Sequence, residues 1–404
     1  MITRRRWFRW PGQHRRLLAW TGGILALLLV AGAAGGYAVL RHLNGNIPQA
    51  DVHGLLGRQP PDAHPQAENI LVIGSDSRAG VPGAAAEGLT TDRSDTMMVI
   101  HIPASRQWAE VMSVPRDSWV PIPACTMGNG ASSAPVDFKI NQSFAIGNLH
   151  GNKTAMGAAC TIKTVEQDTG IYIDHFIVID FDGFKGMVAA LGGVEECNPV
   201  AITDPNSKIT LSAGSHLLTP DQALAYVRAR YGLGDGSDLE RIGRQQAFMT
   251  SLISRARSEL YNPLAMYRFL DAATRSVTID SQLGGVRGLY DLEQSLHGIP
   301  PGKITMFTLP TAPRSTVVPG DTANVVWTPA SKQVFASLRD DVLVSPSLLA
   351  ATQPAATPGR GGPPAASPSP SGPSAGPSAT PAPSATSSPG PGTHRTANQS
   401  ICVG

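Results

Sequence analysis

The chain has 404 residues, of which 42% are hydrophobic and 15% are charged, which is ample for one large folded domain or two ordinary ones. The formal net charge is +2, so the overall charge is nearly neutral and does not select a partner. No Walker, dinucleotide-binding or zinc signature is present in the sequence, and no internal repeat.

The first 40 residues have the pattern of a membrane anchor. Residues 1–16 are rich in arginine, contain no acidic residue, and directly precede an uncharged apolar run at residues 17–40. About 20 apolar residues suffice to cross a bilayer, so this run predicts a transmembrane signal anchor. The positive-inside rule places the basic segment in the cytoplasm and the rest of the protein outside it. The alternative is a cleaved signal peptide, because Ala31-Gly32-Ala33 could serve as a cleavage site.

Residues 41–67 contain Gly, Pro and His, and we expect them to form a juxtamembrane linker before a main domain at residues 68–345. The first predicted strands of this domain are residues 70–73, 96–102 and 109–114. Ligand-binding groups of α/β folds tend to lie at strand ends, so the loops that flank these strands should converge. Their polar residues, with two from a later loop, are Asp76, Arg78, Arg93, Asp95, Arg116, Asp117, Lys139 and Asn141.

The four cysteines fit an oxidising, extracytoplasmic compartment, where disulfides persist. Their spacing matches no metal motif. Cys125 and Cys160 bracket a segment rich in Gly, Ser and Asn, which favours a disulfide between them. Cys197 and Cys402 remain, and pairing them would tie the C-terminal end to the main domain. Four cysteines allow three connectivities, and the sequence alone does not choose among them.

A helix within residues 151–170 should precede a strand at 171–179 and a helix at 181–191 that the Gly192-Gly193 pair ends. The strand contains Asp174 and His175, an acid and a histidine of the types found in catalytic dyads. Adjacent residues on a strand point to opposite faces, and no serine motif accompanies them, so we assign them no such role.

The arginine-rich stretch from Thr219 onwards is the strongest candidate for an anion site. Thr219 with Gln222 signals the start of a helix, and Arg228 and Arg230 lie at its end. Planar guanidinium groups match phosphate oxygens bidentately, so these two arginines, together with Arg241 further along, favour a phosphate site.

A second helix begins at Asp238, and one stripe of it is polar first and apolar afterwards. The stripe, at steps of three and four residues, consists of Asp238, Arg241, Gln245, Phe248 and Leu252. This pattern predicts that the later turns pack in a core while the first two turns face a polar pocket. Arg244 lies off the stripe, and we exclude it from the site.

The remaining pattern is a helix from residue 263, a strand at 277–279, a helix at 289–296, a strand at 304–309 and a last helix at 329–338. Strands and helices alternate, so the predicted class is α/β (α+β) with a central mixed sheet flanked by helices. Residues 346–404 form a tail rich in Pro, Ser and Ala, in which residues 353–392 have Arg360 as their one charged residue. Such a segment is predicted to be disordered.

The motifs together resemble the LytR-CpsA-Psr family. The resemblance lies in residues 69–78, 93–97, 114–118, 139–141 and 228–246, in the order of the family's own signatures. Members are membrane-anchored phosphotransferases that attach glycopolymers to the bacterial cell wall. The resemblance implies that Asp76 and Asp95 bind a metal ion and that Asp238 and Gln245 line the pocket. It also implies that phosphate is bound by Arg93, Arg116, Arg228, Arg230 and Arg241.

The function that this resemblance implies is transfer of a glycopolymer from a polyprenyl-pyrophosphate carrier to peptidoglycan through a phosphodiester bond. Mg²⁺ is the expected cofactor, with Mn²⁺ as a substitute, because Mg²⁺ is held by one or two carboxylates plus substrate phosphates. The expected catalytic residues are Asp76, Arg93, Asp95, Arg116, Arg228, Arg230, Asp238 and Arg241. The expected substrate-binding residues are Arg78, Asp117, Lys139, Asn141 and Gln245.

The expected partners are the lipid-linked glycan, the peptidoglycan acceptor and the cell membrane. Nucleic acid is not expected, because the basic N-terminus is too short to be a DNA-binding domain. Two alternative functions stay open. One is a hydrolase that uses the same groups with water as acceptor, and the other is a membrane-anchored lipid-binding or regulatory protein of the cell envelope.

Overall fold

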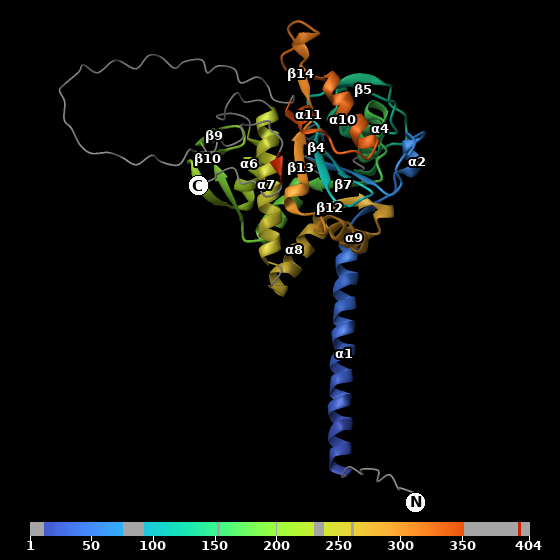
Figure 1. Cartoon of the computed structure of the whole chain (residues 1–404), viewed down its shortest axis with the longest axis vertical. Coiled ribbons are helices and arrows are strands. Elements are labelled where there is room, and N and C mark those ends of the chain that lie inside the picture. Colours follow the sequence, from blue (N-terminus) through green and yellow to red (C-terminus); the bar gives the residue numbers. More distant parts are fainter. Residues whose placement is uncertain are drawn as a thin grey trace, which may run out of the picture.

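The computed structural model describes residues 12–75, 93–151, 154–198, 200–229, 238–259, 262–350 and 395–396. A long helix, α1 (Gly12–Asn46), leads into a domain of mixed helices and strands (Figure 1). Residues Ala26–Asn46 of α1 are long and apolar enough to cross a membrane, which fits a single-pass membrane protein.

Within the described ranges, the centre of the domain is a mixed sheet of eight strands in the order β1-β12-β7-β2-β3-β4-β13-β16. Its middle pairs, β2 with β3 and β3 with β4, are antiparallel, whereas β2 with β7 and β4 with β13 are parallel. The bounds are β1 (Gln49–Ala50), β2 (Glu68–Ser75), β3 (Ser94–Ile102), β4 (Ala109–Ser113), β7 (His175–Asp180), β12 (Val277–Asp280), β13 (Ile304–Thr308) and β16 (Arg395–Thr396). The predicted central mixed sheet is confirmed.

Helices cover both faces of this sheet, which explains the continuous apolar run in β2. Leu71 and Ile73 belong to the main core, together with side chains of α3 (Gln142–Asn148), α4 (Thr154–Thr169) and α10 (Pro329–Arg339). Ile70 and Val72 point to the opposite face, where they pack near Leu292 and Leu296 of α9 (Gly285–His297). Successive strand residues alternate between faces, so a strand buried on both sides must be apolar throughout.

The predicted Cys125–Cys160 disulfide is present. Cys125 follows the β-hairpin's first strand, β5 (Trp119–Ile122), whose partner is β6 (Val136–Lys139), and Cys160 lies on α4. Both residues are buried in the main core, so the bond joins the hairpin to the helix that covers the sheet. Cys197, on β8 (Val194–Asn198), is disulfide-bonded as well, and its partner lies outside the described residues.

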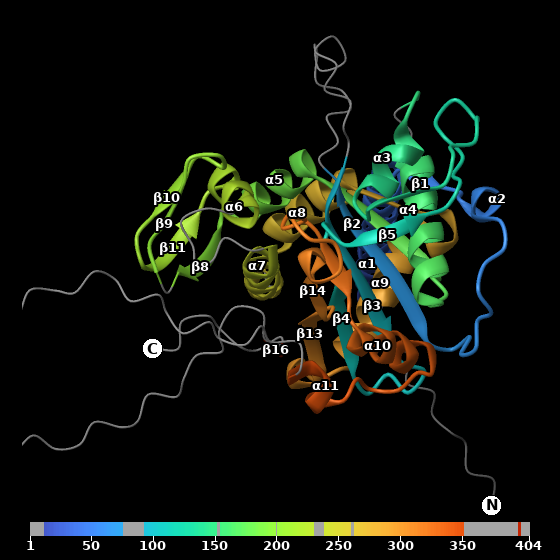
Figure 2. The same cartoon turned by 90° about the horizontal axis from the view of Figure 1, so that it is seen from above.

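Beside the sheet lies a second group of helices and two small hairpins (Figure 2). The helices are α5 (Phe181–Ala190), α6 (Pro220–Arg228), α7 (Asp238–Ser258) and α8 (Pro263–Ser276). The hairpins are β8 (Val194–Asn198) with β11 (Gly214–Leu218), and β9 (Ile202–Asp204) with β10 (Ile209–Leu211). This group has its own core, in which Tyr226 of α6 and Phe248 of α7 are almost fully buried.

The prediction of a linker at residues 41–67 is wrong. Helix α1 continues to Asn46, and Leu43 and Ile47 are buried against the domain. Strand β1 then pairs with β12, and Leu56 of the short helix α2 (His53–Leu56) belongs to the main core. These apolar residues are spaced too irregularly to match a helix or strand pattern, so the sequence alone suggested a linker.

The boundary predicted at residue 345 is also too early. Leu349, on α11 (Pro346–Ala350), lies in the main core, and β16 adds residues 395–396 to the edge of the sheet. The predicted disorder of residues 353–392 falls outside the described residues. A further hairpin that the sequence did not reveal is β14 (Thr311–Pro313) with β15 (Val325–Trp327).

The strand predicted at residues 171–179 begins only at His175. The backbone before His175 bonds to side chains of α4 instead of to a neighbouring strand. The N–H of Ile171 donates to Thr169 Oγ1 and the N–H of Ile173 donates to Glu166 Oε1, both at 3.1 Å. Asp174 accepts the N–H of Asn69, whereas His175 bonds to Asp280. The two side chains therefore have separate structural partners, in keeping with our decision to assign no dyad.

Candidate functional site

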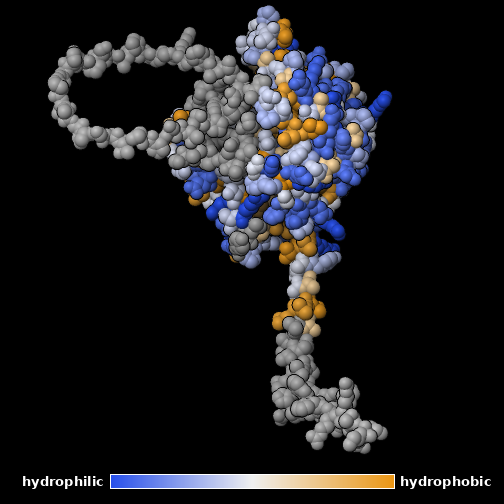
Figure 3. Space-filling view, viewed as in Figure 1, coloured by the Kyte–Doolittle hydropathy of each residue, from blue (hydrophilic) through white to orange (hydrophobic). Residues whose placement is uncertain are grey.

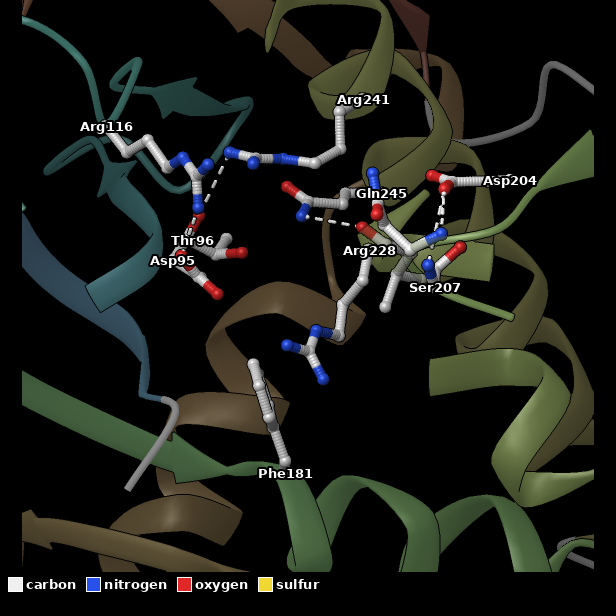
Figure 4. Close-up of a pocket in the computed structure, with 11 residues that line it drawn as sticks. Asp95, Thr96, Arg116, Phe181, Asp204, Ser207, Arg228, Arg241 and Gln245 are labelled. Carbon is white, nitrogen blue, oxygen red and sulfur yellow. Dashed lines mark hydrogen bonds and ion pairs between the residues drawn. The ribbon is translucent and has the colours of Figure 1, made fainter. Parts of the chain in front are cut away.

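A cavity of about 210 Å³ lies where the edge of the sheet meets the second group of helices. Figure 4 shows residues from both parts pointing into it. Its walls come from the sheet, from α5 to α7, and from the turn between β9 and β10. The lining residues are Asp95, Thr96, Arg116, Phe181, Asp204, Asn206, Ser207, Val227, Arg228, Arg241 and Gln245.

Two segments at the strand ends contribute one acidic and one basic residue to the cavity, Asp95 and Arg116. Asp95 is near the start of β3, and Arg116 follows the end of β4. Because β3 and β4 are antiparallel, these two positions lie at the same edge of the sheet, and Arg116 Nη1 donates to Asp95 Oδ1. The predicted convergence of these two loops is confirmed. Among the described residues, Asp95 Oδ2 accepts no hydrogen bond, so one carboxylate oxygen remains for a ligand.

Helix α7 contributes the stripe that the sequence predicted. Arg241 is only 3% exposed, and its Nη2 donates to the backbone oxygen of Asp95 at 3.2 Å. Gln245 also faces the cavity and donates to the backbone oxygen of Val227 at 3.1 Å. One and two turns later, Phe248 and Leu252 are buried in the second core. The polar-then-apolar stripe therefore reflects a helix that passes from the cavity wall into a core.

A neighbouring side chain holds α7 against the sheet. Gln246 is 2% exposed, and its Nε2 donates to Ser113 Oγ at the end of β4 at 3.0 Å. Together with the bond from Arg241 to Asp95, this fixes the first turns of α7 beside the strand ends. Such buried polar contacts position the site because breaking them would leave a polar group unsatisfied.

Helix α6 presents Arg228 from the other side of the cavity. The helix begins with the predicted capping box of Thr219 and Gln222, and Arg228 lies in its last turn. The Arg228 guanidinium carbon lies 4.8 Å from the centre of the Phe181 ring, a cation–π contact at the start of α5. Phe181 was not predicted as a site residue, and its place at a strand end directly after Asp180 was the available signal.

The turn between β9 and β10 forms a third wall that the sequence analysis missed. The Asp204 side chain accepts the N–H groups of Asn206 at 2.8 Å and of Ser207 at 3.3 Å. This arrangement stabilises the turn, and Asn206 and Ser207 line the cavity. The Asp-Pro-Asn-Ser sequence at 204–207 is a turn signal that could have revealed this loop.

Three residues predicted to bind substrate surround Arg116 and do not line the cavity. They are Asp117, Lys139 and Asn141. Lys139 Nζ donates to Asp117 Oδ1 at 2.8 Å, and Asp117 Oδ2 lies 3.8 Å from Arg116 Nε. The backbone N–H of Asn141 donates to the backbone oxygen of Arg116 at 3.3 Å. These residues therefore hold Arg116 in place and do not line the cavity wall. They are partly or fully buried, so their polar character serves internal contacts.

The other predicted residues have different placements. Arg93 precedes β3, is exposed, and does not line the cavity. Asp238 is the first residue of α7, but its side chain is outside the described part of the chain. Asp76, Arg78 and Arg230 lie outside the described residues. Arg244, which we excluded, does not line the cavity; it is buried, and it donates to the backbone oxygen of Ala229.

The model of the LytR_cpsA_psr family matches residues 44–340. The chain belongs to the LytR-CpsA-Psr family. This match begins inside the predicted linker segment, in agreement with the burial of Ile47, Val52 and Leu56. The family membership that the motifs predicted is confirmed.

Named relatives agree with the family assignment. The cell wall biosynthesis protein LcpA of Corynebacterium glutamicum is 32% identical over 304 residues, which is 70% of this chain and 57% of LcpA. The polyisoprenyl-teichoic acid–peptidoglycan teichoic acid transferase TagU of Halalkalibacterium halodurans is 32% identical over 230 residues, or 57% of this chain and 65% of TagU. The aligned part thus spans less than two thirds of either relative's length.

A solved structure shows the same fold. The LytR-Csp2A-Psr enzyme from Actinomyces oris superposes with a TM-score of 0.52 at 23% sequence identity, and covers 72% of this chain and 95% of that protein. At this identity the likeness concerns the fold. It supports the mixed sheet under helices as the common scaffold of the family.

Proposed function

We propose that the protein is a phosphotransferase that moves a glycopolymer from a polyprenyl-pyrophosphate carrier to a hydroxyl of peptidoglycan. The observation that carries this proposal is that three guanidinium groups from separate elements, those of Arg116, Arg228 and Arg241, line one cavity beside the carboxylate of Asp95. The names of the family relatives support the substrate class, since TagU is a teichoic acid transferase that acts on peptidoglycan.

The cavity suits a diphosphate. Arg116 approaches from the sheet, Arg241 from α7 and Arg228 from α6, so phosphate oxygens could be contacted from three directions (Figure 4). Arg116 and Arg241 are already oriented by bonds to Asp95, which reduces the reorganisation needed when charge develops. Phosphoryl transfer depends mainly on such positioning and on electrostatic stabilisation.

The proposed reaction is a substitution at the phosphorus that bears the glycan. The acceptor hydroxyl oxygen bonds to that phosphorus, and the bond from the phosphorus to the bridging oxygen breaks. Polyprenyl phosphate leaves with the bridging oxygen, and the proton of the hydroxyl passes to solvent. The products are a phosphodiester between glycan and peptidoglycan and one polyprenyl phosphate. In this scheme the arginines stabilise the negative charge that develops on the leaving phosphate.

We further propose Mg²⁺ as the cofactor. No group of three or more metal-ligating side chains occurs among the residues that the structure describes, so a metal cage built by protein alone is not part of this proposal. Mg²⁺ typically takes one or two carboxylates plus substrate phosphates and water, and Asp95 Oδ2 fits the first role. Asp76 is the proposed second ligand and lies outside the described residues. Bound Mg²⁺ would neutralise part of the diphosphate charge.

The site is proposed to act outside the cytoplasm, with the N-terminus inside. The arginines of residues 1–16 support this orientation by the positive-inside rule. The Cys125–Cys160 disulfide supports an oxidising compartment for the domain.

The test is product identification after incubation of the full chain in lipid nanodiscs with a polyprenyl-pyrophosphate-linked glycan and peptidoglycan oligomers. With Mg²⁺, mass spectrometry should find glycan joined to the oligomer through one phosphate, and EDTA should prevent its formation. Asp95→Asn should need more Mg²⁺ to reach its own maximal rate. Free phosphoglycan as the product would favour a hydrolase, and tight lipid binding without turnover would favour a binding protein.

A further inference from the structure

The first two turns of α8 expose apolar side chains that no described element covers. Leu264 is 58% exposed, Leu270 39% and Tyr267 36%, and Arg268 beside them is exposed too. We call these four residues the α8 patch. The following half of α8 is covered, because Thr274 and Ser276 are buried against neighbouring elements. A contiguous exposed apolar patch can mark a site of interaction with a protein or a membrane. The neighbouring elements indicate which of the two applies here.

Helix α1 contacts α8 at Asp271, the residue that follows this patch. His42 Nε2 and Asn46 Nδ2 each lie 2.9 Å from Asp271 Oδ1 of α8, and Asn44 Oδ1 accepts the N–H of Val286 on α9 at 3.1 Å. Leu264 and Asp271 are seven residues apart, so they share a face of α8. The face that binds α1 in the second half of α8 therefore carries Leu264, Tyr267 and Arg268 of the patch in the first half.

The position of the membrane follows from α1. Its apolar run ends at Leu40, which is 57% exposed, and His42 two residues later already contacts α8. The base of the domain thus begins within about 3 Å of the end of the apolar run. Leu264 lies about 10 Å along α8 from Asp271. Figure 1 shows that α8 begins below the level at which α1 joins the domain, so the patch reaches the level of the apolar part of α1.

The composition of the patch fits a lipid headgroup layer. Leucine side chains enter the acyl boundary, tyrosine prefers the membrane–water interface, and arginine is attracted to anionic headgroups. The acids nearest in the described sequence are already paired, since Asp271 bonds to His42 and Arg275 and Glu259 lies 3.3 Å from Arg255. The space-filling view shows apolar side chains where α1 meets the domain (Figure 3).

We propose that the α8 patch inserts into the headgroup layer of an anionic phospholipid membrane, so that α1 and α8 together attach the domain at two points. A single helix would leave the domain free to tilt, whereas a second point of attachment restricts that tilt. Helix α8 packs closely on α5, since a Cβ at Gly183 of α5 would lie only 2.2 Å from Ser276 Cβ. The first residue of α5 is Phe181 in the cavity wall, so the attachment also fixes the height of the cavity above the lipid.

The test uses the full chain in nanodiscs that contain a phosphatidylglycerol probe with a photoreactive group near its headgroup. After irradiation and digestion, peptides that contain residues 264–270 and residues 37–40 should carry the lipid. The internal control is the peptide with Val317 and Val318, which are 64% and 38% exposed and follow β14 in the chain, before β15. Strand β14 lies at the end of the domain opposite α1 (Figure 1). We expect its labelling to be at least about tenfold lower.

Variants sharpen the result without any need for substrate, so this test and the test of transferase activity fail independently. Leu264→Ser with Tyr267→Ser should reduce labelling of residues 264–270 at least about fivefold, while labelling of residues 37–40 stays unchanged. The matched control is Val317→Ser with Val318→Ser, which should change neither. Labelling of residues 264–270 no greater than that of the Val317 peptide would overturn the proposal, and so would an absence of label on α1.

Discussion

At the scale of single residues, two arginines one turn apart on α7 have different tasks. Arg241 lines the cavity and donates to the backbone of Asp95, whereas Arg244 is buried and donates to the backbone of Ala229. Helical spacing placed Arg241 on the stripe of Gln245 and Phe248, but Arg244 is also four residues before Phe248, so it is their contacts that separate the two arginines. What spacing did not reveal is that Arg244 is a structural contact rather than a solvated side chain.

This difference predicts separate effects of the same substitution. Arg241→Lys keeps the charge but loses the planar fork, and the loss of one such donor typically costs about 2.7–4 kcal/mol, or roughly 10²–10³ in rate. Arg244→Lys should stay within about tenfold of wild type in kcat/KM. It should instead lower the free energy of unfolding by about 1–3 kcal/mol, because a buried acceptor loses its donor. Lipid-to-acceptor transfer rates and thermal melting check both, and an equal loss of rate in the two folded variants would contradict this division.

A second residue-scale prediction concerns Glu110, which is fully buried on β4 and accepts the N–H of Val344 at 3.1 Å. Burial raises the pKa of its carboxyl from 4.5 to about 7, the hydrogen bond from Val344 acting in the opposite sense. For an acid whose pKa is raised by folding, the native state binds the extra proton. The stabilising contribution is therefore complete below pH 4.5, falls as the pH rises, and is lost above about pH 7.

Glu110→Gln removes the charge and keeps an acceptor for Val344. At about pH 8 this variant should unfold with a free energy higher than wild type by on the order of 1–3 kcal/mol, and at about pH 4.5 the two should nearly coincide. Chemical denaturation at both values measures the difference. A difference that is the same at both values would show that burial of this charge is not its cause.

At the scale of elements, pattern strength decided what the sequence could predict. The strands β2, β3 and β4 and the helices α5, α8 and α10 are long or apolar enough for periodicity to identify them. The hairpin of β9 and β10 has three residues in each strand, too few for a pattern, and it was missed although its turn lines the cavity. The strand near residue 171 was predicted too long, because side chains of α4 satisfy the backbone that an adjacent strand would otherwise bind.

The Cys125–Cys160 disulfide belongs to this scale, because it joins a hairpin to α4 across a sequence separation of 35. Closing a loop of this length restricts the unfolded chain, and such a bond typically contributes about 2–4 kcal/mol. Cys125→Ala with Cys160→Ala should lower the free energy of unfolding by at least this amount, since both side chains are buried. Denaturant titration measures it, with wild type under the same non-reducing conditions as the comparison. An unchanged unfolding midpoint would show that the bond contributes nothing to stability.

At the scale of the whole molecule, the sequence indicated a domain joined to its membrane helix by a linker. The structure shows that the end of α1 and the residues after it pack directly on the domain. The apolar run of residues 17–40 was visible from composition, but the docking of residues 42–56 depends on tertiary contacts with α8, α9 and β12. The C-terminal end of the domain also depends on tertiary contacts, because Leu349 is buried in the main core. Strand order and the meeting of the sheet edge with α7 also result from contacts between distant segments, such as that of Gln246 with Ser113.

The most direct test of the central claim is the stoichiometry of phosphorus in the products. The full chain in nanodiscs, Mg²⁺, a polyprenyl-pyrophosphate-linked glycan and peptidoglycan oligomers would be followed together by ³¹P NMR. Transfer in the cavity of Arg116, Arg228 and Arg241 predicts that one phosphodiester joined to peptidoglycan appears for each polyprenyl phosphate released. Release of polyprenyl phosphate with a glycan phosphomonoester, and without a peptidoglycan-linked phosphodiester, would contradict it.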